Sequence, residues 1–123
     1  MASLPDDTLR RILVQIQQRA VESKRALQIT QQTITPKERE RRILQLTIDE
    51  LKGLDPGVNT YKGVGKMFVM TPRVEMEKEL KSQEKELTDD ITSLNKKMKF
   101  LEKQFVEAQS QLNDIFHNAR SNQ

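Results

Sequence analysis

The strongest constraint in this sequence is a stripe of apolar residues that recurs every three or four positions through its second half. From Leu80, alternating steps of four and three reach twelve positions, of which eleven are apolar. These seam positions are Leu80, Glu84, Leu87, Ile91, Leu94, Met98, Leu101, Phe105, Ala108, Leu112, Ile115 and Ala119. An average spacing of about 3.5 residues is typical of the contact seam of a coiled coil. The spacing therefore predicts a long second helix over residues 72–119.

A weaker version of the same pattern occupies the first half. From Leu9, the same steps reach eight positions, and the two that are not apolar carry small side chains. The positions are Leu9, Leu13, Ile16, Ala20, Ser23, Leu27, Thr30 and Ile34. Because the distance between packed helices depends on the side chains at the contact, small residues allow a close approach. We predict a first helix over residues 6–46.

Pro36 interrupts this first helix, because a proline inside a helix removes a hydrogen bond at a cost of about 3 kcal/mol. The sequence TPKE at residues 35–38 also matches a capping box with proline at the first helical position. A kink and a restart of the helix are both compatible with the sequence here. Thr47 can cap one further turn before glycine and proline residues end it, which predicts a short helical turn and loop over residues 47–57.

Residues 58–70 differ in character from both flanking segments. β-Branched, aromatic and methionine side chains are concentrated there, and two glycines allow the chain to reverse. We predict two short strands, near residues 58–62 and 66–70, that form a hairpin. Its residues are Val58, Tyr61, Gly63, Val64, Gly65, Met67, Phe68, Val69 and Met70.

Two long helices joined by a short insert fold back most simply into an antiparallel pair. The predicted fold class is mainly α: a long antiparallel two-helix coiled coil with a short β hairpin at the bend, in a single domain of residues 1–123. In this arrangement residues near 46 lie beside residues near 74, and both termini lie at the end away from the hairpin.

The predicted hairpin needs partners. A lone two-stranded hairpin is marginal in water and leaves its backbone edges unpaired. Edge-to-edge pairing with hairpins of other chains would close an inter-subunit β-barrel and remove those edges. We therefore expect an obligate subunit of an oligomer. In the simpler alternative, Tyr61 and Phe68 only plug the end of the coiled coil.

Composition argues against several other functions. The chain has no cysteine, which rules out disulfides and thiolate sites, and His117 is its only histidine. No stretch approaches the roughly 20 apolar residues of a membrane helix, and residues 1–30 contain no signal-peptide core. We expect a cytoplasmic protein that needs no metal or cofactor and binds no membrane.

Charge and motifs point in the same direction. The net charge of +3 comes from 21 basic and 18 acidic residues that are mixed along the chain. We interpret Lys96, Lys97 and Lys99 as the solvated face of a helix, with nucleic-acid binding as a minor alternative. The sequence GVG at residues 63–65 leads into a strand rather than a helix N-terminus, which argues against a phosphate site. No nucleophile is accompanied by a base and an orienting acid, so we do not expect an enzyme.

The order of helix, β insert and helix resembles the prefoldin family, and in particular its β-type subunits. The sequence YKGVGKMF at residues 61–68 carries this resemblance, and LTIDEL at residues 46–51 supports it. The resemblance implies a heterohexamer of α- and β-type subunits whose hairpins assemble into a β-barrel platform. It also implies an ATP-independent chaperone that captures unfolded proteins, notably actin and tubulin, and delivers them to the cytosolic chaperonin.

If the hairpin end forms a platform, the end that carries both termini is free to bind clients. The apolar residues expected there are Leu4, Leu9, Ile12, Leu13, Ile16, Leu112, Ile115 and Phe116. Exposed apolar groups at helix ends would hold non-native chains weakly and adaptably. Ile12 and Phe116 lie one step off their seams, where client binding and completion of the coiled coil are equally open. Phe100 and Val106, also off the seam, are further candidates.

The alternative to a chaperone subunit is a coiled-coil tether or scaffold whose hairpin docks into a structural complex. A scaffold gives no reason for Ile12 and Phe116 to be apolar at the helix ends. Our first hypothesis is therefore a chaperone subunit, and our second is a coiled-coil tether or scaffold.

Overall fold

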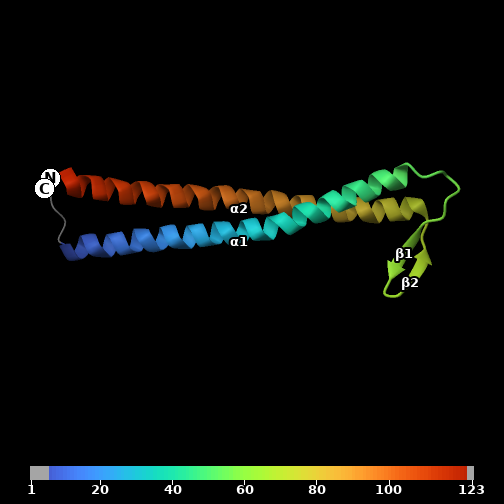
Figure 1. The fold of residues 1–123 in the computed structure, drawn as a ribbon, viewed down its shortest axis with the longest axis horizontal. Coiled ribbons are helices and arrows are strands. Elements are labelled where there is room, and N and C mark those ends of the chain that lie inside the picture. Colours follow the sequence, from blue (N-terminus) through green and yellow to red (C-terminus); the bar gives the residue numbers. More distant parts are fainter. Residues whose placement is uncertain (1–5, 122–123) are drawn as a thin grey trace. The chain divides into compact units, whose positions relative to one another are not determined.

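The computed structural model describes residues 6–121, with side chains described as far as residue 118. The elements follow in the order α1 (Asp6–Lys52), β1 (Tyr61–Val64), β2 (Met67–Met70) and α2 (Arg73–Ser121) (Figure 1). This arrangement of two long helices and a short antiparallel hairpin confirms the predicted fold class. None of the described helices is long and apolar enough to cross a membrane.

The chain divides into two compact units, each built from parts of both helices. The tip unit comprises Met1–Thr33 with Leu94–Gln123, and the hairpin unit comprises Ile34–Ser93.

The tip unit is held together by the predicted seam. Its core consists of four buried residues, Ile16 and Ala20 from α1 with Ala108 and Leu112 from α2. Partly buried side chains pack around this core, namely Ile12, Leu13, Phe105 and Ile115. The two polar seam positions of α1, Ser23 and Thr30, are also buried. The Thr30 hydroxyl donates a hydrogen bond of 2.7 Å to the Ala26 carbonyl, so that its burial leaves no unsatisfied donor.

In the hairpin unit, α1 does not stop at residue 46 but continues past Pro36 to Lys52. The seam spacing continues with it, since Ile34, Ile48 and Leu51 are all buried. Burying an aliphatic side chain contributes about 1.5–3 kcal/mol. Three such side chains outweigh the roughly 3 kcal/mol that a proline costs inside a helix. The local capping signals at residues 35–38 and at Thr47 are therefore overridden by packing.

Polar contacts interrupt the apolar seam of the hairpin unit. Glu84 accepts a hydrogen bond of 3.1 Å from the Gln45 amide, which explains the one polar seam position of the second helix. Lys37 and Asp90 form an ion pair at 3.4 Å. Gln45 thus lies beside Glu84, whereas we predicted that residues near 46 would lie beside residues near 74. The difference arises because α1 extends six residues further than predicted, so that later residues of α1 lie beside the start of α2.

The first strand of the hairpin begins and ends later than predicted, at Tyr61–Val64 rather than near residues 58–62, and the second begins at Met67. The register of the hairpin pairs Tyr61 with Met70 and Val64 with Met67, which leaves a two-residue turn. Gly65, the first residue of that turn, has a φ of 62°, as a type II′ turn requires at this position. Val58 lies outside both strands, in the preceding loop, where its N–H donates to the Asp55 carbonyl.

Candidate interaction surfaces

The two faces of the hairpin follow from its register, because residues opposite each other in antiparallel strands share a face. One face, the tyrosine face, carries Tyr61, Gly63, Phe68 and Met70. The other, the lysine face, carries Lys62, Val64, Met67 and Val69. On the tyrosine face, a Cβ placed on Gly63 would lie 3.8 Å from the Phe68 ring, so this ring covers the bare glycine backbone.

Both faces of the hairpin are apolar and exposed. Phe68 is 78% exposed on the tyrosine face and Met67 is 70% exposed on the lysine face. Every residue of both strands is exposed. Among residues 6–121 each strand has only the other as a neighbour, so each also presents an outer edge without a strand partner there. An apolar element exposed on two faces and two edges is typical of a surface that is covered by other chains.

Hydrogen bonds at the base of the hairpin tie the two strands together. The Thr71 N–H donates to the Thr60 carbonyl at 2.9 Å, and the Thr60 hydroxyl donates to the Thr71 carbonyl at 2.6 Å. Thr60 is buried, although all the strand residues that follow it are exposed. Both bonds involve the buried Thr60, so they are partly shielded from water. They therefore limit how far the two ends of the hairpin can separate.

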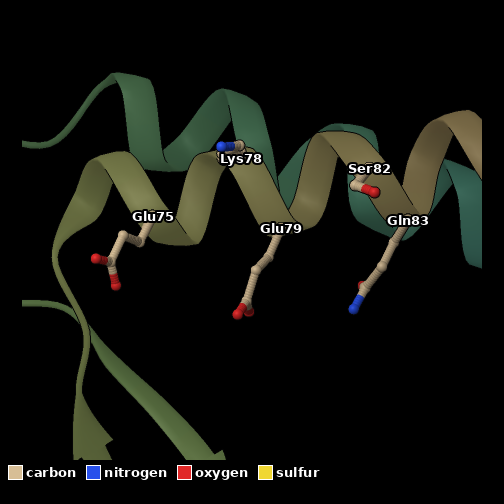
Figure 2. A pocket seen from close by; sticks show the side chains of 5 residues that line it. All are labelled: Glu75, Lys78, Glu79, Ser82 and Gln83. Atoms are coloured by element: carbon tan, nitrogen blue, oxygen red, sulfur yellow. The ribbon is translucent and has the colours of Figure 1, made fainter.

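Two further contacts connect α2 with the hairpin and its loop. Lys62 and Glu79 form an ion pair at 2.8 Å. Figure 2 shows Glu75, Glu79 and Gln83 projecting from α2 in one row. The Arg73 guanidinium donates to the carbonyls of Leu54 and Asp55 in the loop that follows α1. These contacts orient the hairpin relative to the first turns of α2.

The surface around Glu79 does not form an enclosed site. The shallow hollow in Figure 2 is lined by five side chains, all from α2: Glu75, Lys78, Glu79, Ser82 and Gln83. The described residues also contain no group of three or more side chains that could hold a metal ion. The candidate functional surfaces are therefore the hairpin and the exposed apolar side chains of the tip unit.

The client-binding residues predicted for the tip differ in how far the structure buries them. Ile16 and Leu112 are buried in the core, and four others are partly buried: Leu9, Ile12, Leu13 and Ile115. Ile12, expected to add exposed surface, instead packs against the core cluster. Phe116 is 51% exposed. Leu4 lies outside the described residues.

Other exposed apolar residues of the tip unit were not singled out from the sequence. Val14 and Val21 of α1 are 59% and 67% exposed. Phe100 and Val106 of α2, which the sequence did suggest, are 60% and 57% exposed. The signal for the two valines was their seven-residue spacing, with each directly after a seam position.

These exposed residues can be assigned to the two sides of the helix pair. A residue directly after a seam position lies on one flank of its helix, and a residue directly before it lies on the other. In an antiparallel pair, the following flanks of both helices come to the same side. The following flank of the tip unit carries Val14, Val21, Val106 and Phe116, and we call these four residues the tip face.

Comparison with known proteins agrees with this architecture. A family model described as a prefoldin subunit matches residues 14–119. The chain belongs to the prefoldin subunit family. Prefoldin subunits are components of a chaperone complex, which they form with other prefoldin subunits.

Similar curated proteins are named as one particular subunit. The probable prefoldin subunit 1 of Dictyostelium discoideum is 35% identical over 91 residues, which cover 74% of this chain and 79% of the relative. Prefoldin subunit 1 of Arabidopsis thaliana is 30% identical over 112 residues, which cover 91% and 88%. This chain is therefore similar to prefoldin subunit 1 over most of its length.

A solved structure supports the fold. The crystal structure of the prefoldin beta subunit from Thermococcus strain KS-1 superposes with a TM-score of 0.80 at 21% sequence identity. The match covers 94% of this chain and 96% of that chain. The predicted resemblance to a β-type prefoldin subunit is thus confirmed.

Proposed function

We propose that this chain is a β-type subunit of a hexameric, ATP-independent chaperone in the cytoplasm. Its hairpin joins an inter-subunit β-barrel with the hairpins of other α- and β-type subunits. Its tip unit holds unfolded proteins such as actin and tubulin, and the complex delivers them to the cytosolic chaperonin. Actin, tubulin and the chaperonin enter this proposal through the family resemblance.

The observation that carries the proposal is the exposure of the hairpin. Phe68, Met67 and Met70 are each more than 60% exposed on strands whose outer edges have no partner in the part of the chain that the structure describes. Pairing with other hairpins would satisfy these edges and cover the apolar side chains in one step. A hairpin that only plugged a coiled coil would not leave these residues exposed on both faces.

The first test is the native mass and subunit composition of the complex purified through a tag on this chain. We expect six small chains of several kinds. A monomer, a simple homodimer or a complex with one large folded protein would contradict the proposal and favour a tether.

The second test places a charge on the hairpin. Phe68→Asp should abolish assembly, because the carboxylate would be buried without a partner in the barrel. Phe100→Asp is the matched control, since Phe100 is also strongly exposed but lies on a helix of the tip unit. Size-exclusion chromatography should show loss of the hexamer for the first variant only. Equal assembly of both variants would exclude the hairpin as the assembly surface.

The third test addresses the holding of clients. Val21→Ser with Phe116→Ser should weaken suppression of the aggregation of a denatured client by the assembled complex. Ile43→Ser is the control, because Ile43 is 63% exposed on α1 of the hairpin unit. Intact assembly with unchanged holding by the double variant would remove the tip face from the proposal.

A further inference from the structure

The basic residues of this chain are not shared evenly between its two units. The tip unit contains ten basic and six acidic residues, whereas the hairpin unit contains eleven basic and twelve acidic residues. The net positive charge of the protein therefore comes from the tip unit. A charge imbalance of this kind influences which partners approach a surface.

Within the tip unit, the charges are also divided between the two sides. The acidic residues Glu22 and Asp114 lie directly before a seam residue, on the flank opposite the tip face, whereas Glu107, at the equivalent position, also lines a hollow with Val106. The basic residues of the following flank and the outer surface are Arg10, Arg11, Lys24, Arg25, Lys96, Lys99 and Lys103. Their acidic counterparts on the same flank are Asp7, in the first turn of α1, and Glu102.

Contacts in the structure place these basic groups next to the exposed apolar ones. Arg10 and Arg11 line a shallow hollow with Val14. The Lys24 ammonium lies 5.4 Å from the centre of the ring of Phe105, the partly buried seam residue directly before Val106, where the attraction between a cation and an aromatic face is effective.

On α2, the exposed Val106 also has basic neighbours. Lys99 and Lys103 line a second hollow with Val106, and Glu102 and Glu107 complete its lining. The apolar tip face is thus bordered by cations on both helices. Acidic groups also enter this border, namely Glu102 and Glu107 beside Val106 on α2 and Asp7 in the first turn of α1.

From this arrangement we propose that the tip face selects non-native segments that are both apolar and acidic. The inference rests on the proposed holding function and adds a class of client to it. Apolar side chains of the client contact Val14, Val21, Val106 and Phe116, while its carboxylates lie beside the surrounding basic groups. Exposed ion pairs are individually weak and screened by salt, so the preference is moderate and depends on ionic strength.

The test uses the assembled complex with two denatured clients of similar length and opposite charge. Suitable clients are reduced α-lactalbumin, which is acidic, and reduced lysozyme, which is basic, both with cysteines blocked by neutral carbamidomethyl groups. Dissociation constants are measured by fluorescence anisotropy at about 50 mM and 300 mM salt. At the lower salt concentration, we expect the complex to bind the acidic client about five- to tenfold more tightly than the basic client. Most of this difference between the two clients should be lost at the higher salt concentration.

Two double variants, each of which removes two positive charges, test which flank of the tip unit is responsible for the preference for the acidic client. Arg10→Gln with Lys99→Gln removes two cations from the following flank. Arg19→Gln with Lys97→Gln removes two from the opposite flank of the same helices. Glutamine has nearly the helix propensity of arginine and lysine, so α1 and α2 are retained. The first pair should weaken binding of the acidic client about three- to fivefold and the second pair should leave it unchanged.

The outcomes separate this inference from the function on which it rests. If the complex holds neither client, the holding function itself is wrong. If it holds both equally, or if both double variants lose the same affinity, the charge preference of the tip face is wrong. Binding of a single-stranded oligonucleotide as tightly as the acidic client would overturn the selection of protein segments, since negative charge alone would then suffice.

Discussion

The two units expose apolar surface in different ways. In the hairpin unit both strands expose apolar side chains and also leave their outer backbone edges unpaired, so a partner of the hairpin must supply hydrogen bonds in register as well as apolar contact. In the tip unit the exposed apolar side chains lie on helices, whose backbone hydrogen bonds are internal. The hairpin therefore demands one geometry from its partner, whereas the tip face requires only apolar groups and a suitable charge.

The seams of the two units differ in a related way. In the tip unit, α1 and α2 pack together through aliphatic and small residues, among them Ala20 and Ala108. The hairpin unit includes the Gln45–Glu84 hydrogen bond and the Lys37–Asp90 ion pair between its helices. Polar groups in a seam specify register at some expense of stability. The hairpin unit, whose strands need a partner in register, thus also has the more closely specified helix register.

The largest expected effect compares matched core residues of the two units. Ile34→Ala should lower the free energy of unfolding by about 3 kcal/mol and Ile16→Ala by about 2 kcal/mol. Ile34 loses more because it is 2% exposed, against 8% for Ile16. Urea unfolding followed by circular dichroism measures both values. A larger loss for Ile16→Ala would mean that the tip unit, rather than the hairpin unit, contributes more of the stability.

Pro36→Ala should stabilise the chain by about 2 kcal/mol, because it restores a helical hydrogen bond that proline cannot make. Thermal unfolding gives the change in midpoint. Gln32→Ala, at an exposed position one turn earlier, is the control and should have an effect below about 0.5 kcal/mol. No gain from Pro36→Ala would show that the helix already compensates for the missing bond.

The polar seam pair is the next test. Glu84→Ala should cost about 1 kcal/mol, since it leaves the part-buried Gln45 amide without this acceptor. Gln45→Leu with Glu84→Leu should recover that stability while loosening the register. A disulfide reporter that replaces Lys37 and Asp90 with cysteine should then form in lower yield. An unchanged yield would argue that apolar packing alone sets the register.

The smallest effect is expected at the Lys37–Asp90 ion pair, whose side chains are 33% and 51% exposed. Lys37→Gln should cost about 0.3 kcal/mol at low salt and nothing measurable at about 1 M salt. Urea unfolding at both salt concentrations measures the difference. A loss that persists at high salt would indicate that the aliphatic part of Lys37, rather than its charge, contributes to the seam.

The seam was the part of the fold most readily predicted from the sequence. Ser23, Thr30 and Glu84 were placed in it by spacing alone, and the structure buries the first two and gives Glu84 a partner across the seam. The end of α1 was not predicted. Thr47 is a possible local helix cap, and the sequence alone does not show that packing against α2 buries the next residue, Ile48.

The candidate surfaces were predicted less completely. The exposed hairpin residues from Tyr61 to Met70 follow from composition and strand pattern. The bonds between Thr60 and Thr71 do not, since they depend on how the two ends of the hairpin meet. The exposure of Val14 and Val21 was not predicted. It depends on whether the partner helix covers them, and this follows only from their positions relative to the seam.

The pairing of the chain's two ends in the tip unit also affects how the protein forms during synthesis. The contact between Lys37 and Asp90 can form once residue 90 has left the ribosome, whereas the core around Ile16 must wait for Ala108 and Leu112. Closing a longer loop is entropically more expensive, although the increase is slow. The hairpin unit, the part proposed to assemble, is thus complete in sequence before the tip unit, and the seam of α1 in the tip unit stays exposed until Ala108 and Leu112 are made.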